Sequence, residues 1–362
     1  MTAITDIVCT PVVTPTSVDA PDAADFVAMI EQLNAACRYD IDSDHLDYEP
    51  VTELPSWLDQ TDRLQYGLLA REGDRVVGAL QVSVPLEQDA SNVEFELAIS
   101  PAHRGRGVAA ALMPHVERIA REHGRRLLQT FTVHRADLDG PRLTSPTGFG
   151  TIPVEGASSF YLAQGFVLAQ VERNSVFELT QPLDRVRAML DEALAAAGAD
   201  YRVVSWTCPT PDAFKHDYAF VQSRMSTDAP MGELDWPEER WDAARVERRD
   251  ANVLAGGQTL SVVAVQHIPS GELVAFNELM IGPDRTRPTH QWSTLVVKAH
   301  RGHRLGMVVK CANILRWREL VPESPFISTF NAEENRPMLD VNEALGFAPF
   351  THTGAWQREL AD

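Results

Sequence analysis

Several protein classes are excluded by features that the sequence lacks. It has no run of about 18 consecutive apolar residues, which predicts that no helix crosses a membrane. The N-terminus has no basic segment followed by an apolar one, so we expect no signal peptide. Its four cysteines are widely spaced, without a CxxC pair or zinc-ligand spacing, which predicts no metal site and a reduced, cytoplasmic protein. They are Cys9, Cys37, Cys208 and Cys311.

Basic residues are scarce. There are 32 Lys and Arg against 51 Asp and Glu, which gives a formal charge of −19. This balance argues against a general nucleic-acid binder, because non-specific affinity for nucleic acid needs basic patches. An acidic surface suits cationic ligands, although excess negative charge also simply keeps a protein soluble. With 362 residues, 44% hydrophobic and 23% charged, the chain is long enough for two domains with real cores.

The chain passes twice through one pattern of predicted elements. Arg104 and Arg301 occupy matching places, 197 residues apart, and an Ala-rich helix over 183–197 separates the two passes. We therefore predict an α/β fold with an N-terminal domain over 1–182, a helical connector over 183–199 and a C-terminal domain over 200–362. In the first pass we expect strands at 7–13, 66–71, 75–84, 93–100 and 127–133, and helices at 22–38, 54–63 and 108–123; in the second, strands at 201–209, 259–266, 272–280, 291–297 and 326–330, and helices at 212–225, 238–254 and up to 320.

The first copy carries one insertion. Gly165 and Gly346 are 181 residues apart, and 197 − 181 leaves 16 extra residues between His134 and Gly156. This segment is rich in Gly, Pro and Thr, which predicts a loop. Loops of this length in compact domains are usually functional or disordered.

The sharpest local motif is His103-Arg-Gly-Arg-Gly-Val-Ala109, between a predicted strand and a predicted helix. A tight turn before a helix N-terminus presents free backbone N–H groups and the positive end of the helix dipole, which suits a pyrophosphate. Gly105 and Gly107 let the backbone approach such a ligand closely. The alternative is a plain strand-to-helix turn, since the motif is neither a Walker A loop nor GxGxxG.

In context the motif resembles motif A of the GNAT (GCN5-related N-acetyltransferase) superfamily, [R/Q]xxGx[G/A], filled here by Arg104, Gly107 and Ala109. The closing Tyr-x-x-x-Gly-Phe signature matches Tyr161 to Phe166. The second copy has a comparable loop and ends on Gly346-Phe347. The chain thus resembles a tandem member of this superfamily over nearly its whole length.

This resemblance implies two tandem GNAT domains, each a mixed, mostly antiparallel sheet flanked by helices. It implies direct transfer of an acetyl group from acetyl-CoA, the co-substrate, to an amine, without a metal. The expected contacts with the co-substrate are the strand backbone at Leu97, Ala98 and Ile99 for the pantetheine arm, and Arg104, Gly105, Arg106, Gly107, Val108 and Ala109 for the pyrophosphate.

Three residues of the first copy are candidates for catalysis. Glu94 and Glu96 share one face of the 93–100 strand, and either can act as general base. Tyr161 stands where the resembling family often has the acid that protonates the thiolate. The alternatives are two solvated carboxylates and a tyrosine that only packs.

The second copy departs from the pattern. Gln291 and Ser293 replace the carboxylates, Asn342 replaces the tyrosine, and Arg304 replaces Gly107, so we predict a degenerate domain. His290, Glu278 or His303 remains open as an unaligned base. This copy can still bind CoA through residues that resemble the family's contacts: Arg301, Gly302, Arg304, Gly306, Asn331 and Asn335.

An acidic segment, Tyr39 to Glu49, follows the first helix, where the resembling fold usually borders its acceptor site. Asp42, Asp44 and Asp47 are therefore candidates to attract an ammonium group; the alternative is a solvated loop. We expect a small-molecule primary amine such as an amino sugar, a polyamine or an antibiotic-like compound, in a monomer or homodimer without nucleic-acid or membrane partners. A protein or peptide acceptor and a non-catalytic acyl-CoA-binding scaffold are the alternatives.

Overall fold

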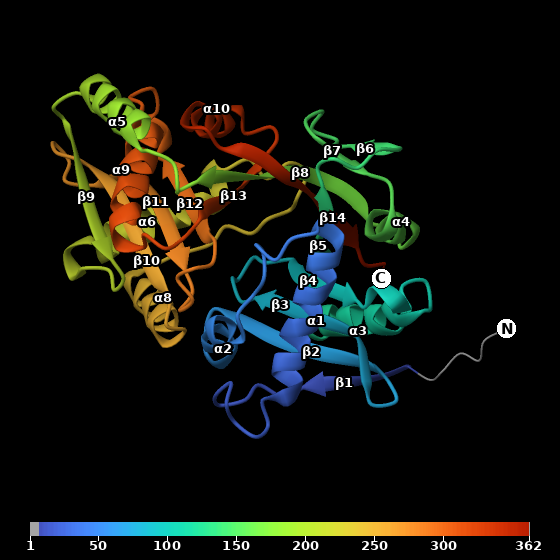
Figure 1. Cartoon of the computed structure of the whole chain (residues 1–362). Coiled ribbons are helices and arrows are strands. Elements are labelled where there is room, and N and C mark those ends of the chain that lie inside the picture. The colour runs from blue at the N-terminus through green and yellow to red at the C-terminus, as the bar shows by residue number, and fades with distance from the viewer. Residues whose placement is uncertain (1–6, 362) are drawn as a thin grey trace. The chain divides into compact units, whose positions relative to one another are not determined.

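A computed structural model describes residues 7–361 (Figure 1). The chain divides into two compact units. Unit 1 consists of Met1–Glu172, Met231–Pro237 and Thr351–Asp362, and unit 2 of Arg173–Pro230 and Glu238–Phe350. The units therefore differ from the two sequence repeats, because each unit includes residues that belong to the other repeat.

Unit 1 contains a sheet in the order β1-β2-β3-β4-β5-β14-β8, with the first part of β8 as its last strand. The pair β4–β5 is parallel, whereas β1–β2, β2–β3, β3–β4 and β5–β14 are antiparallel. In Figure 1, β14 lies beside β5 and β8. The elements are β1 (Ile7–Val12), α1 (Ala24–Ile41), α2 (Pro50–Leu58), β2 (Arg63–Glu72), β3 (Arg75–Pro85), β4 (Asn92–Ile99), a 3-10 turn (Pro101–His103), α3 (Val108–Glu122), β5 (Leu127–Arg135), β6 (Arg142–Thr144), β7 (Thr151–Pro153), α4 (Gly156–Ala163), β8 (Val167–Glu178) and β14 (Ala348–Glu359).

The two faces of the unit 1 sheet are covered by different helices. Ala98 packs with Phe26 of α1 and Trp57 of α2. Phe95, on the other face of β4, packs with Leu112 of α3. The predicted alternation along this strand is therefore confirmed, and it turns Glu94 and Glu96 toward the α1 and α2 side.

Two predicted elements of unit 1 need correction. The second helix runs over Pro50–Leu58 rather than 54–63, because proline is well placed at the first helical position and Pro50 starts the helix. The 134–156 insertion is not a bare loop: β6 and β7 pair as a hairpin, with Arg142 donating to the Thr151 side chain at 2.6 Å. The alternation that marks a strand cannot be recognised in segments of three residues.

Unit 2 has a sheet in the order β8-β13-β12-β11-β10-β9, starting with the second part of β8. Asn174 of β8 donates to the Ser328 hydroxyl of β13 at 2.8 Å. No helix in the described part of the chain is long and apolar enough to cross a membrane. The elements are α5 (Asp184–Ala197), β9 (Tyr201–Thr207), α6 (Asp212–Ser223), α7 (Met225–Asp228), α8 (Ala243–Ala255), β10 (Thr259–His267), β11 (Leu273–Ile281), β12 (Thr289–Val296), a 3-10 turn (Lys298–His300), α9 (Leu305–Leu320), β13 (Phe326–Ala332) and α10 (Arg336–Leu345).

Candidate active site

Strands β4 and β5 of unit 1 form a fork. Their parallel register pairs Asn92 with Leu127 and ends where Phe95 pairs with Thr130, although β4 continues to Ile99. The backbone of Glu96 to Ile99 therefore has no register partner on β5 among the residues that the structure describes. Such a strand edge can hydrogen-bond an extended, amide-containing chain, and the expected pantetheine contacts Leu97, Ala98 and Ile99 lie on it.

The fork leads into the expected pyrophosphate loop. Gly105 and Gly107 adopt left-handed backbone conformations, with φ of 73° and 85°, and α3 begins directly after them at Val108. Ala111 N–H is the donor that closes the first helical turn, on Gly107 O at 3.0 Å. The N–H groups of Val108 and Ala109 precede it and have no acceptor within the helix. The loop thus fits a phosphate by its backbone donors and helix dipole.

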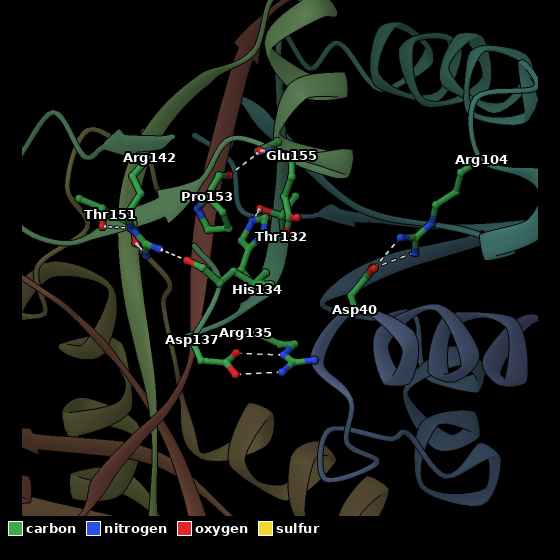
Figure 2. Close-up of polar contacts among 12 residues, drawn as sticks. Asp40, Arg104, Thr132, His134, Arg135, Asp137, Arg142, Thr151, Pro153 and Glu155 are labelled. Carbon is green, nitrogen blue, oxygen red and sulfur yellow. Dashed lines mark hydrogen bonds and ion pairs between the residues drawn. The ribbon is translucent and has the colours of Figure 1, made fainter. Parts of the chain in front are cut away.

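Arg104 turns its side chain away from this role. Its guanidinium donates two hydrogen bonds to the Asp40 carboxylate of α1, at 2.5 and 2.9 Å (Figure 2). It also lies over the Tyr39 ring at 5.2 Å. In this arrangement Arg104 binds the end of α1, whereas Arg106 of the same loop is exposed.

The corresponding loop of unit 2 keeps the same conformation. Arg304, at the position of Gly107, is left-handed with φ of 56°, and Gly302 has φ of 88°. Left-handed conformations are costly for a residue with a Cβ. Arg301 repeats the backbone contact of Arg104: its Nε donates to Val296 O at 3.1 Å, as Arg104 Nε does to Ile99 O at 3.4 Å.

Glu94 and Glu96 differ in their surroundings. Arg63 of β2 donates to Glu94 at 2.7 Å, so that carboxylate is neutralised by an ion pair. Glu96 accepts a hydrogen bond from the Tyr48 hydroxyl at 3.3 Å. Burial raises the pKa of Glu96 to about 7, against the lowering effect of the Tyr48 hydrogen bond. This pKa suits Glu96 to act as a general base at neutral pH.

Tyr161 of α4 lies at the fork. Its ring packs against Phe95, the last residue of β4 that pairs with β5, with ring centroids 6.1 Å apart, and it is 3% exposed. Burial raises the pKa of its hydroxyl, and the Glu96 carboxylate raises it further. The hydroxyl is therefore protonated at neutral pH, which a proton donor requires. Packing and acid catalysis are compatible roles for this ring.

Sequence reasoning missed two residues beside Glu96. They are Tyr48, in the segment between α1 and α2, and Glu53 of α2. Burial and the Glu96 carboxylate raise the pKa of Glu53 to about 7. Tyr48 lies in the acidic segment 39–49, where only the aspartates were candidates, and Glu53 lies in no recognisable motif.

The three candidate acceptor-binding aspartates have different surroundings. The Asp47 carboxylate accepts a hydrogen bond from Arg38 of α1 at 2.7 Å. Asp42, the C-cap residue of α1, is largely exposed, and its carboxylate lies 3.9 Å from the Arg135 guanidinium. The backbone carbonyl of Asp44 accepts the backbone N–H of Asp47 at 3.1 Å, within the same segment. The charges of Asp42 and Asp47 are thus partly balanced by arginine.

Past the fork, β5 carries a buried imidazole. His134 Nε2 lies 2.8 Å from the Thr132 hydroxyl oxygen (Figure 2), which also accepts from Trp356 at 2.8 Å. Burial, with a smaller contribution from the charge of Arg142, lowers the pKa of His134 to about 4. The imidazole is therefore neutral and only weakly basic at neutral pH, which disfavours it as the base.

In unit 2 the position of Tyr161 is filled by a hydrogen-bonded chain. Lys310 of α9, fully buried, donates to Asn342 Oδ1 at 2.7 Å, and Asn342 Nδ2 donates to Asn331 Oδ1 at 2.6 Å. Asn335 caps α10 and its N–H donates to Ala332 O at 2.9 Å. The predicted CoA contact Asn331 is therefore engaged within the protein through its carbonyl oxygen.

Glu278, one of the open bases of the second copy, is also engaged. It is fully buried and accepts two hydrogen bonds from Arg249, at 2.7 and 2.9 Å, besides bonds from Tyr218 and Gln222. Although burial acts to raise it, the Arg249 charge brings the pKa of Glu278 below its usual value. A carboxylate held in this way is a poor proton acceptor.

No group of three His, Cys, Asp or Glu side chains within 7–361 is arranged to hold a metal ion.

Comparison with known proteins agrees with this geometry. Residues 27–140 match the model of the acetyltransferase (GNAT) family. A tandem GNAT protein from the clavulanic acid biosynthesis pathway aligns over 99% of this chain and 100% of its own, with 22% identity and a TM-score of 0.73. The chain has the tandem GNAT fold. The resemblance and the fold class drawn from the sequence are thus confirmed.

Two further structures share the fold. A GCN5-related N-acetyltransferase from Sphaerobacter thermophilus has 15% identity and a TM-score of 0.58, over 97% of this chain and 95% of its own. A glucosamine N-acetyltransferase region of a fungal multi-domain β-N-acetylglucosaminidase has 12% identity and a TM-score of 0.59, over 98% of this chain and 38% of its own. No curated protein matches the sequence significantly. The family model covers the part of unit 1 that includes β4, the loop 104–109 and α3.

Proposed function

We propose that unit 1 transfers an acetyl group from acetyl-CoA to the primary amine of a small molecule. The observation that carries the proposal is the fork between β4 and β5, with Glu96 just past it and Tyr161 packed at its base. Glu96 takes a proton from the acceptor ammonium, the amine attacks the thioester, and Tyr161 protonates the leaving thiolate. The loop 104–109 holds the pyrophosphate through its backbone, and the β4 backbone holds the pantetheine arm.

Unit 2 serves in this proposal as a degenerate copy that contributes no base. Gln291 and Ser293 stand in place of the two glutamates, and Glu278 is neutralised by Arg249. Asn342 in place of Tyr161 has no acidic proton to give. Its loop keeps the backbone conformation of the working loop, so binding of CoA there is compatible with the loss of chemistry.

An acetyl-transfer assay tests the proposed function. Purified protein and acetyl-CoA are mixed with amino sugars, diamines and aminoglycoside-like amines in one series and with short peptides in another. We expect free thiol and an acetylated product, identified by mass, with members of the small-amine series and not with peptides. Transfer to peptides alone would overturn the acceptor class. Absence of transfer in both series, together with absence of acetyl-CoA binding, would overturn the activity.

A further inference from the structure

The segment between α1 and α2 is fastened to α1 by two side chains one helical turn apart. Asn34, which is 2% exposed, donates to Tyr48 O and accepts from Tyr48 N–H, both at 2.8 Å. Arg38 donates to the Asp47 carboxylate at 2.7 Å. The reciprocal pair on Tyr48 fixes its main chain as a neighbouring strand would. The backbone position from which the Tyr48 side chain extends is therefore fixed as well.

From that point the Tyr48 hydroxyl reaches Glu96 Oε2 at 3.3 Å. A donor on a carboxylate stabilises its ionised form. Glu53 is close enough for the Glu96 charge to raise its pKa, yet no hydrogen bond contributes to the shift at Glu53. Within residues 7–361, a side-chain donor reaches the Glu96 carboxylate and none reaches the Glu53 carboxylate, so the two coupled groups are stabilised unequally.

We propose that Tyr48, held through its main chain by Asn34, is a positioning residue that makes Glu96, and not Glu53, the ionised carboxylate of the site. The inference rests on the proposed function, because it specifies which carboxylate of that site accepts the proton. Coupled carboxylates avoid carrying two charges at once. Glu53 therefore keeps its proton while Glu96 acts, and Tyr48 decides between them.

Other titratable groups also face Glu96. One of them is the Cys37 thiol of α1. Burial, and to a smaller extent the Glu96 carboxylate, raises the pKa of this thiol to about 12. Tyr161 of α4 has a raised pKa as well. Both are therefore uncharged at neutral pH. The neighbouring Glu94 on β4 is balanced by Arg63. The asymmetry between Glu96 and Glu53 thus depends on the Tyr48 hydrogen bond.

Carbon-13 NMR of glutamate side-chain carboxyls tests the proposal without any need for an acceptor. Glu96→Gln and Glu53→Gln identify the two resonances by their loss, and each titration midpoint is followed in wild type and in variants. In Tyr48→Phe we expect the Glu96 midpoint to rise by about 0.5–1 pH unit, because one donor to the anion is removed. In Asn34→Ala we expect a rise in the same direction. Tyr66→Phe, which removes a hydroxyl that lies 2.7 Å from His123, is the matched control and should leave Glu96 unchanged.

An unchanged Glu96 midpoint in Tyr48→Phe would overturn the proposal, as would an equal shift in Tyr66→Phe. A shift in Asn34→Ala without one in Tyr48→Phe would also overturn it, since the hydroxyl would then not be the acting group. Should Asn34→Ala fail to fold, Tyr48→Phe decides alone. If the titrations behave as expected while the protein transfers no acetyl group, the proposed function fails and the carboxylate asymmetry stands.

Discussion

Glu96→Gln is expected to lower kcat/KM for acetyl transfer by a factor of about 10²–10⁴. Glutamine keeps the size of the side chain and can still accept from Tyr48, but it cannot take a proton from the acceptor ammonium. The variant should fold well, because the charge that burial disfavours at this position is removed. Steady-state rates of wild type and variant, with an acceptor found in the transfer assay, measure the effect.

The wild-type pH profile and Glu94→Gln complete this test. The base must be ionised, and its pKa is raised to about 7, so wild-type kcat/KM should fall as the pH drops through about 7. Glu94→Gln removes the same charge two residues away, from a carboxylate bound to Arg63, and should change the rate only a few-fold. Equal losses in the two variants, or a rate that Glu96→Gln leaves intact, would contradict the assignment of Glu96 as base.

Lys310→Met is expected to stabilise the protein at pH 7, by about 2–4 kcal/mol. Burial lowers the pKa of Lys310 from 10.5 to about 7, a difference equivalent to about 5 kcal/mol. The unfolded chain binds this proton below pH 10.5 and the folded chain only below about 7, so stability is lost as the pH falls through that window. Losing the hydrogen bond to Asn342 offsets about 1–2 kcal/mol. Methionine is the residue at the matching position of unit 1, Met113.

Calorimetric unfolding at pH 7 and pH 9.5 measures this prediction. The gain in Tm should be larger at pH 7, because the free-energy cost of releasing the lysine proton on folding shrinks as the pH rises toward 10.5. Lys298→Met changes an exposed lysine and should leave Tm nearly unchanged at both pH values. A Tm that falls in Lys310→Met would contradict the account and would indicate that the chain Lys310–Asn342–Asn331 is a stabilising network.

Local patterns made much of unit 1 predictable. Alternation along one strand was enough to place Phe95 and Glu96 on opposite faces, and the glycines at 105 and 107 marked the turn before α3. The same alternation cannot distinguish Glu94 from Glu96, because they share a face. What separates them is Arg63 on one side and Tyr48 on the other, and those contacts bridge 31 and 48 residues of chain.

Contacts between distant parts of the chain explain what the sequence did not predict. Strand β14 lies beside β5 of unit 1, although it follows β13 of unit 2 in the chain. Residues 231–237 join unit 1 through bonds such as Asp235 N–H to Gln357 Oε1 at 2.9 Å. Periodicity identifies each strand but not its neighbour in the sheet, so the division at 182 and 199 followed the repeat and not the contacts.

The measurement that tests the central claim most directly is a calorimetric titration with acetyl-CoA of wild type, Ala109→Glu and Gly306→Glu. The two positions match between the copies, in the first turns of α3 and α9. A Cβ at Gly306 would meet nothing closer than Val296 at 3.7 Å, and a glutamate in the first turn stabilises a helix that has no ligand at its N-terminus, so both variants should fold.

The added carboxylate repels a pyrophosphate. We expect Ala109→Glu to abolish binding at the unit 1 site and Gly306→Glu to leave that site intact. Binding that survives Ala109→Glu and is lost in Gly306→Glu would place the co-substrate in unit 2 and contradict the account.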